Sequence, residues 1–155
     1  MSEIGDKYYS EEAETLIYAT GLAESNYQYI RQHPTGPARS FWQVEPDTAM
    51  DNIVNYLEYR PHIIPRLARA AHTTKNKWET PANPRHHGKL KSWWERELEQ
   101  NLASAICHVR LKYWRVPKKI PKSIEGMADY WLKSYNAGGK GSIKHFLDAW
   151  EGRRK

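Results

Sequence analysis

The sequence lacks several features that hold other small proteins together or place them in membranes. It has 155 residues and a single cysteine, Cys107, so no disulfide can form within the chain. Cys107 lies in a helical apolar pattern, where we expect it to pack. No apolar run is long enough to cross a bilayer, and no basic segment followed by an apolar run opens the chain. We therefore expect no membrane span and no signal peptide.

Phenylalanine is scarce, whereas rings with a polar edge are common: the chain has 2 Phe against 7 Trp and 10 Tyr. Such rings suit half-wet surfaces, including sugar-binding clefts and platforms for single-stranded nucleic acid. The formal net charge of +6 favours an anionic partner, which includes nucleic acid, a membrane surface or an acidic polymer such as bacterial cell wall. Charge alone does not choose among these partners.

The length suits one domain that can bury a core without metal or disulfide support. We expect a single domain over residues 1–155, with loose termini at residues 1–9 and 151–155. Residues 72–90 are polar, basic and proline-bearing without a period, which predicts a long surface loop. The adjacent His86 and His87 in this loop rarely face one ion together, so we expect no metal and no cofactor.

Apolar residues recur at helical spacing through most of the chain, which predicts an all-α fold of about six to seven helices. Ser10 is expected to cap a first helix that ends near Ser25, and Pro46 to open a second. Ser123 and Ser142 are expected to cap the last two helices. The longest pattern predicts one central, most buried helix with these inward residues: Trp94, Leu98, Leu102, Ala105, Ile106, Val109 and Tyr113.

Glu24 ends the apolar stripe of the first predicted helix, on the face that carries Ala13, Ile17 and Thr20. A carboxylate held against apolar surface prefers its neutral, proton-donating form, and a general acid needs that form at neutral pH. The alternative is a structural carboxylate satisfied by a helix N-terminus or by Arg39.

Three segments carry a resemblance to a known family. They are Glu24-Ser25, the segment 38–49 with Trp42-Gln43-Val44-Glu45-Pro46-Asp47-Thr48-Ala49, and Tyr135-Asn136-Ala137-Gly138. In this order and spacing they resemble the lysozyme-like lytic transglycosylases, which cleave the glycan strands of peptidoglycan. The resemblance extends from about residue 10 to about residue 150 and implies a lysozyme-like fold. The small size and the missing export signal favour a bacteriophage product.

The resemblance implies a role for each matching residue. Glu24 would protonate the glycosidic oxygen, and the sugar's own 6-hydroxyl would then attack to give a 1,6-anhydro end. If water attacked instead, Glu45 would become a catalytic candidate, as two-carboxylate glycosidases require. Trp42 would either pack or form a sugar platform. The residues expected to bind or position substrate are Ser25, Trp42, Gln43, Glu45, Tyr135 and Asn136, with Ser25 orienting Glu24 and Tyr135 hydrogen-bonding near it.

The chain also departs from the family pattern. Ser40 stands where the family usually has glycine, and Phe41-Trp42 replaces Leu-Met, which predicts an altered cleft and specificity. The expected partners are peptidoglycan glycan strands and other virion proteins, with nucleic acid less favoured. The protein would be made in the host cytoplasm and would act from the virion or after release to the periplasm and cell wall. The alternative is a catalytically weak or inactive lysozyme-like structural virion protein that contacts nucleic acid or partner proteins.

Overall fold

The computed structural model describes residues 1–152, and within this range the chain forms seven α-helices and no β-strand. The all-α class predicted from the periodicity is confirmed. The helices are α1 (Glu11–Ser25), α2 (Pro46–Asn55), α3 (Ile64–Ala70), α4 (His87–Gln100), α5 (Leu102–Trp114), α6 (Ile124–Ser134) and α7 (Ile143–Trp150).

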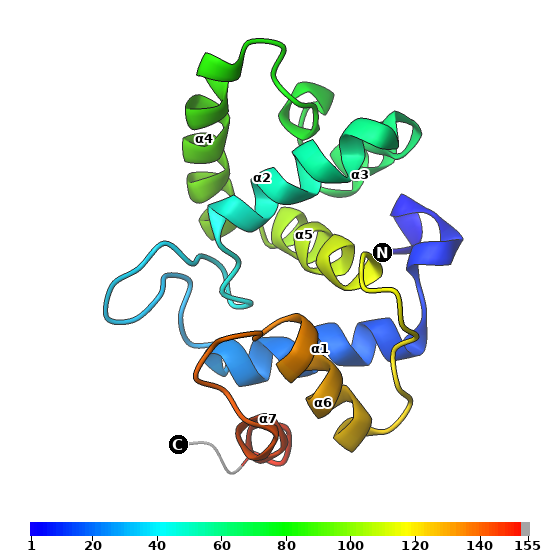
Figure 1. Ribbon diagram of the computed structural model, residues 1–155, viewed down its shortest axis with the longest axis vertical. Coiled ribbons are helices and arrows are strands. Elements are labelled where there is room, and N and C mark those ends of the chain that lie inside the picture. The colour runs from blue at the N-terminus through cyan, green and yellow to red at the C-terminus, as the bar shows by residue number, and fades with distance from the viewer. Residues whose placement is uncertain (153–155) are drawn as a thin grey trace.

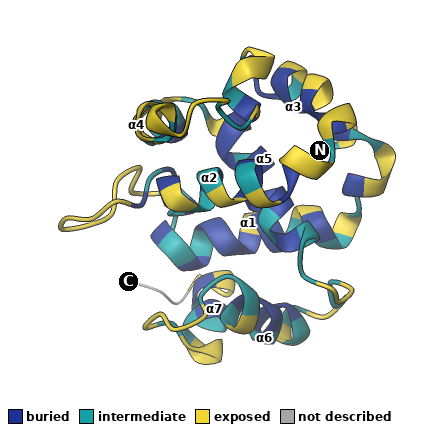
Figure 2. Cartoon of the chain, turned by 45° about the horizontal axis from the view of Figure 1, so that its top comes forward, coloured by how far each residue is buried: buried dark blue, intermediate teal, exposed yellow. Residues whose placement is uncertain are grey.

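Helix α5 lies at the centre of the molecule. Figure 1 shows α2, α3 and α4 on one side of it and α1, α6 and α7 on the other. Its residues Ala105, Val109 and Leu111 are fully buried, and Figure 2 shows dark, buried surface along α1 and α5. The prediction that the most buried helix falls in this stretch is confirmed, because residues on nearly every side of α5 are covered.

Serine caps start three of the helices at the predicted places. The hydroxyl of Ser10 accepts the N–H of Ala13 at 3.0 Å and so begins α1. Ser123 begins α6 and Ser142 begins α7 in the same way, each accepting the N–H three residues on. Each cap satisfies a backbone donor that has no partner within its helix.

The long helix predicted across residues 94–113 is two helices, broken at Asn101. Asn101 is extended (φ −125°), its side-chain oxygen accepts the N–H of Ser104 at 3.1 Å, and its amide donates to the Ala71 carbonyl at 2.7 Å. An asparagine side chain competes with the helix for backbone groups in this way. The break turns Leu102 outward, with 45% of its surface exposed, so its expected burial is wrong.

The expectation of a loose N-terminus over residues 1–9 is wrong as well. Two 3₁₀ turns, Ser2–Ile4 and Asp6–Tyr8, place Ile4 and Tyr8 in the core. The Nε of Arg110 holds this segment by donating to the Tyr8 carbonyl at 2.5 Å. At the other end Glu151 and Gly152 form an exposed turn, and residues 153–155 lie outside the described residues.

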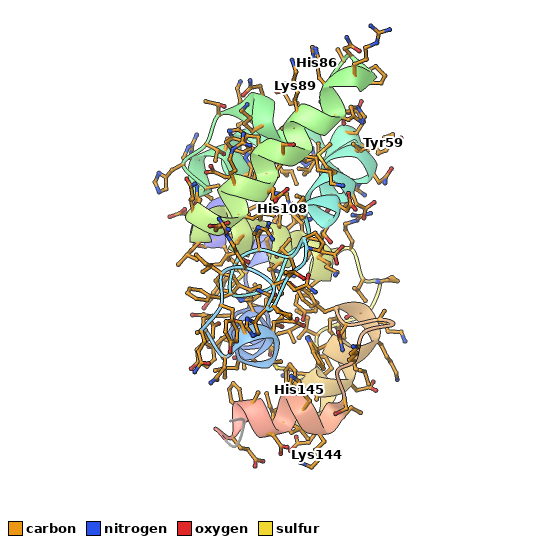
Figure 3. The ribbon with its side chains drawn as sticks, turned by 90° about the vertical axis from the view of Figure 1, so that its left-hand side faces the viewer. Tyr59, His86, Lys89, His108, Lys144 and His145 are labelled. Atoms are coloured by element: carbon orange, nitrogen blue, oxygen red, sulfur yellow. The ribbon has the colours of Figure 1, made fainter. Side chains whose placement is uncertain are left out.

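Residues 72–90 are only partly the predicted surface loop. A 3₁₀ turn at Lys75–Trp78 buries Trp78 completely, and α4 already begins at His87. The Trp78 ring stacks on His108 at a centroid distance of 4.7 Å. Figure 3 shows His108 among the interior side chains and His86 and Lys89 at the outer end of α4. The single buried ring of Trp78 anchors this polar segment. A search for periodic apolar residues does not detect a single anchor of this kind.

Candidate functional site

A groove of about 980 Å³ brings together five of the seven residues expected at the site. Its walls come from the end of α1, the loop between α1 and α2, the start of α2, and the loop after α6, which Figure 1 shows gathered on the left side. The expected residues that line it are Glu24, Gln43, Glu45, Tyr135 and Asn136. Segments more than 100 residues apart in sequence thus form one concave surface, of the size that small-molecule and oligomer sites have.

Glu24 is half-buried on the last turn of α1, and residues from α6 and α7 contact its carboxyl group and the backbone beside it. The indole N–H of Trp131 donates to Oε1 of Glu24 at 2.9 Å. The ring of His145 stacks on Trp131, and its Nε2 donates to the carbonyl of Ala23 at 2.8 Å, next to Glu24 in the chain. Figure 3 shows His145 on the side of α7 that faces the rest of the molecule. The carboxyl group therefore has a fixed position.

Tyr135 lines the groove with Glu24, and its hydroxyl hydrogen-bonds to the backbone of the loop before α2. The hydroxyl donates to the Trp42 carbonyl at 2.6 Å, so its single proton is not available for Glu24. The ring stacks on Tyr113 at 5.2 Å. Burial raises the pKa of Tyr135 well above its ordinary value, and the nearby charge of Glu24 adds to this rise. Tyr135 thus stays neutral and ties the wall after α6 to the loop before α2.

Ser25 and Trp42 do not line the groove, so their expected contact with substrate is wrong. Ser25 is fully buried, and its hydroxyl donates to the Phe41 carbonyl at 2.7 Å. Trp42 is 5% exposed, and its indole N–H donates to the Ile17 carbonyl at 2.9 Å. Both hydrogen bonds fasten the loop to α1. The bulk of Phe41-Trp42 fills the space between this loop and the helix. The packing alternative for Trp42 is the correct one.

The loop that carries Gln43 is held in a left-handed conformation at two positions. Ser40 has φ +67° and Gln43 has φ +50°, values that non-glycine residues adopt rarely. The side-chain amide of Gln43 donates to the Ser40 carbonyl at 2.9 Å. This bond fixes the Gln43 side chain at the groove wall and leaves its oxygen as an acceptor.

Asn136 occupies a tight space formed by two glycines. A Cβ on Gly139 would lie 2.1 Å from Oδ1 of Asn136, and a Cβ on Gly141 would lie 2.1 Å from its Nδ2. The Asn136 carbonyl accepts the N–H of Gly139 at 2.9 Å, so the residue holds the turn as expected. Its buried Nδ2 has no hydrogen-bond partner among the described residues. A donor of this kind at the groove suits a ligand oxygen.

Lys112 is a groove residue that the sequence reasoning missed. It comes from the last turn of α5, donates from Nζ to the Tyr135 carbonyl at 3.3 Å, and lies 4.3 Å from the centre of the Tyr135 ring. Burial lowers the pKa of Lys112, and the charges of Glu24 and Glu45 oppose that shift. A lysine near the end of a helix is usually solvated, so the sequence gives no signal for its position. The sequence likewise gives no signal for the position of His145 beside the end of α1.

Arg39, one of the two partners that the structural alternative offered for Glu24, forms its ion pairs with α4. Its guanidinium pairs with Glu95 at 2.8 Å and with Glu99 at 3.6 Å, both on α4. Arg31 also pairs with Glu99, at 2.8 Å. These ion pairs tie the loop between α1 and α2 to α4. Glu45 lies exposed at the start of α2 and makes no side-chain cap there.

The groove has no metal-binding pattern. Within residues 1–152 no three His, Cys, Asp or Glu side chains lie where they could hold one metal ion. Cys107 is buried as expected, and burial raises the pKa of its thiol to about 12, which leaves it unreactive. Over the same range, no helix combines the length and apolar character needed to traverse a lipid bilayer.

The fold and the groove define an all-α protein with a half-buried glutamate in a polar cleft. Comparisons with protein-family models, with curated proteins and with solved structures find no significant match to this chain. The function is therefore argued from the groove and from the three sequence segments that meet in it.

Proposed function

We propose that this protein cleaves the glycan strands of peptidoglycan as a lysozyme-like lytic transglycosylase, with Glu24 as general acid and then base. The observation that carries the proposal is the Glu24 carboxyl group, held by the Trp131 N–H at 2.9 Å inside a groove that Gln43 and Tyr135 also line. The segments of the family resemblance contribute these three residues, and folding brings them to one surface. A fixed carboxyl group in a partly desolvated cleft suits proton transfer to a leaving oxygen.

In the proposed mechanism the two oxygens of Glu24 have different roles. An indole N–H only donates, so Oε1 accepts it, and we assign the proton of the neutral acid to Oε2. That proton passes to the glycosidic oxygen as the bond to the anomeric carbon breaks. The carboxylate then takes the proton of the sugar's 6-hydroxyl as this oxygen bonds to the anomeric carbon. The neutral acid is restored, and the strand gains a 1,6-anhydro end.

Hydrolysis is the second candidate reaction, because Glu45 lines the same groove and is exposed to solvent. A second carboxylate across the cleft can activate water in place of the 6-hydroxyl. The two reactions use the same acid and differ in the product end.

The backbone at Ser40 also supports the resemblance. Its φ of +67° lies in the region that glycine favours, and the family usually has glycine at this place. We further propose that the protein is a bacteriophage product that acts from the virion or after release to the cell wall, and that peptidoglycan is its partner. In this chain Phe41 and Trp42 pack between their own loop and α1, so an altered cleft would arise from a changed position of this loop.

The test is digestion of purified peptidoglycan sacculi by the wild type and by Glu24→Gln. The proposal predicts release of soluble fragments by the wild type and a loss of about a hundredfold or more for Glu24→Gln, as expected on removing a general acid. Glu58→Gln, an exposed glutamate outside the groove, is the matched control and should keep full activity. Release of fragments by Glu24→Gln at the wild-type rate would refute the role of Glu24. An inactive wild type on several wall types would favour the inactive structural alternative.

A further inference from the structure

A second pocket, separate from the groove, lies where the N-terminal segment meets the connection between α5 and α6. Its volume is about 570 Å³. Figure 1 shows this yellow connection running beside the start of α1, on the side of the molecule opposite the loop between α1 and α2. We call it the α5–α6 pocket; its cationic lining residues are Lys7, Arg110, Lys118, Lys119 and Lys122. The pocket shares no residue with the groove.

Arg110 is the unusual member of this set. It is 4% exposed, and within residues 1–152 its side chain makes no ion pair with a carboxylate. Its Nε donates to the Tyr8 carbonyl, and its guanidinium carbon lies 5.3 Å from the centre of the Trp114 ring. A buried charge normally has a counter-ion, because desolvation is costly. Among the described residues, the Arg110 charge lacks one.

The remaining lining strengthens the positive potential at this place. Four lysines surround the opening, and the carboxylate of Glu12 is the one acidic side chain in the lining. The four lysines are themselves exposed, so their side chains can move toward a ligand. A concave site with an excess of positive charge concentrates anions near it.

We propose that the α5–α6 pocket binds a phosphate group, with Arg110 as its buried anchor and the lysines around it. A planar guanidinium pairs with two oxygens of a phosphate, and flexible ammonium groups can reach the remaining ones. The side walls are apolar, formed by Val116, Pro117 and Ile120, and so fit the carbon part of a phosphate ester. This site does not depend on glycan cleavage, because none of the groove residues takes part in it.

The direct test measures binding of inorganic phosphate by titration calorimetry and by the rise in melting temperature. The pocket variant is Lys118→Gln with Lys122→Gln, because both side chains are exposed and the fold does not depend on them. Its control is Lys75→Gln with Lys89→Gln, which removes the same charge from exposed lysines elsewhere. The proposal predicts at least about a tenfold loss of affinity in the pocket variant and no loss in the control, as two charge-assisted contacts are removed.

A phosphate group occurs both in free esters and in the backbone of nucleic acids, and further arms of the experiment separate these two sources. A sugar phosphate and a short single-stranded oligonucleotide are titrated beside inorganic phosphate. Tighter binding of the sugar phosphate indicates a free ester, and tighter binding of the oligonucleotide with the same loss in the pocket variant indicates a phosphodiester. Arg110→Lys should lower the affinity for every phosphate ligand, whereas Glu24→Gln should change none of these affinities. Equal affinity of the pocket and control variants for all three probes, or no phosphate binding by the wild type, would overturn the proposal.

Discussion

The indole N–H of Trp131 on α6 donates to Oε1 of Glu24 on α1 at 2.9 Å, across 107 residues of sequence. Trp131 is also packed in the core, where its ring lies against Phe146. One side chain therefore joins the packing of α6 and α7 to the position of the proposed acid.

Trp131→Phe removes the N–H and keeps most of the ring, so it separates these two tasks. We expect a folded protein that is about 1–2 kcal/mol less stable and has much lower activity on sacculi, because Glu24 loses the donor that fixes it. Trp94→Phe is the matched control, since Trp94 is equally buried and its N–H donates to the Lys77 carbonyl at 3.0 Å, away from the groove. Urea denaturation and sacculus digestion give the two readings. Equal activity of both variants would mean that the bond to Glu24 does not matter for the reaction.

Gly141 and Gly88 make a second matched pair. A Cβ on Gly141 would lie 2.4 Å from the Trp131 ring as well as against Asn136, whereas a Cβ on Gly88 meets nothing within 4 Å. Gly141→Ala should therefore displace both neighbours and lower stability and activity. Gly88→Ala lies in the first turn of α4 and should stabilise the protein by less than about 1 kcal/mol, because alanine is the better helix former. A neutral Gly141→Ala in thermal melts would show that the loop after α6 is looser than described.

His108 should make the stability depend on pH. Burial lowers its pKa to about 3 from the ordinary 6.5, so the native state holds the ring neutral while the unfolded chain takes up a proton below pH 6.5. The unfolded state then binds more protons, and the free energy of unfolding falls as pH drops from 6.5 toward 3, by up to about 1.4 kcal/mol per pH unit. Above pH 6.5 the ring is neutral in both states, so this loss of stability does not occur there.

His108→Gln tests this dependence, because the glutamine oxygen can accept from Asn52 as Nδ1 of His108 does at 3.1 Å. We expect the variant to be less stable at neutral pH and to lose stability less steeply than the wild type between about pH 6.5 and pH 5. The remaining histidines and carboxylates are common to both proteins and cancel in the comparison. Parallel curves from urea denaturation would contradict the neutral, buried state of His108.

The break at Asn101 predicts opposite outcomes for two leucines of the same sequence pattern. Leu98 is fully buried and Leu102 is 45% exposed. Leu98→Ala should cost about 2–5 kcal/mol in the free energy of unfolding, and Leu102→Ala well under about 1 kcal/mol. Chemical denaturation distinguishes them directly. A large loss at Leu102 would mean that one continuous helix buries both residues.

Much of the fold was predictable because its signals are local. Serine caps, Pro46 and apolar spacing mark where helices begin and which face is covered, and they act within a few residues. The break at Asn101 was missed because Leu102 continues the apolar pattern while the asparagine cap depends on a carbonyl from Ala71, far away in the chain. The buried N-terminus was missed for a similar reason, since Tyr8 is held by Arg110.

The candidate site was predictable in part. Glu24, Gln43 and Tyr135 were found from short segments whose spacing resembles a family, and the groove brings them together. Lys112 and His145 were missed because their role comes from tertiary position alone. Trp42 was included among the substrate-binding residues because an exposed and a buried tryptophan look alike in a sequence.

The central claim is that Glu24 transfers the proton in glycan cleavage, and mass spectrometry of sacculus digests tests it most directly. The proposal predicts that wild type releases fragments lighter by one water than hydrolysed ones, as 1,6-anhydro ends require. Glu24→Gln should bind sacculi and release these fragments at least about a hundredfold more slowly. Hydrated ends that disappear in Glu45→Gln would assign hydrolysis to the same groove. Anhydro fragments from Glu24→Gln in wild-type amounts would contradict the account.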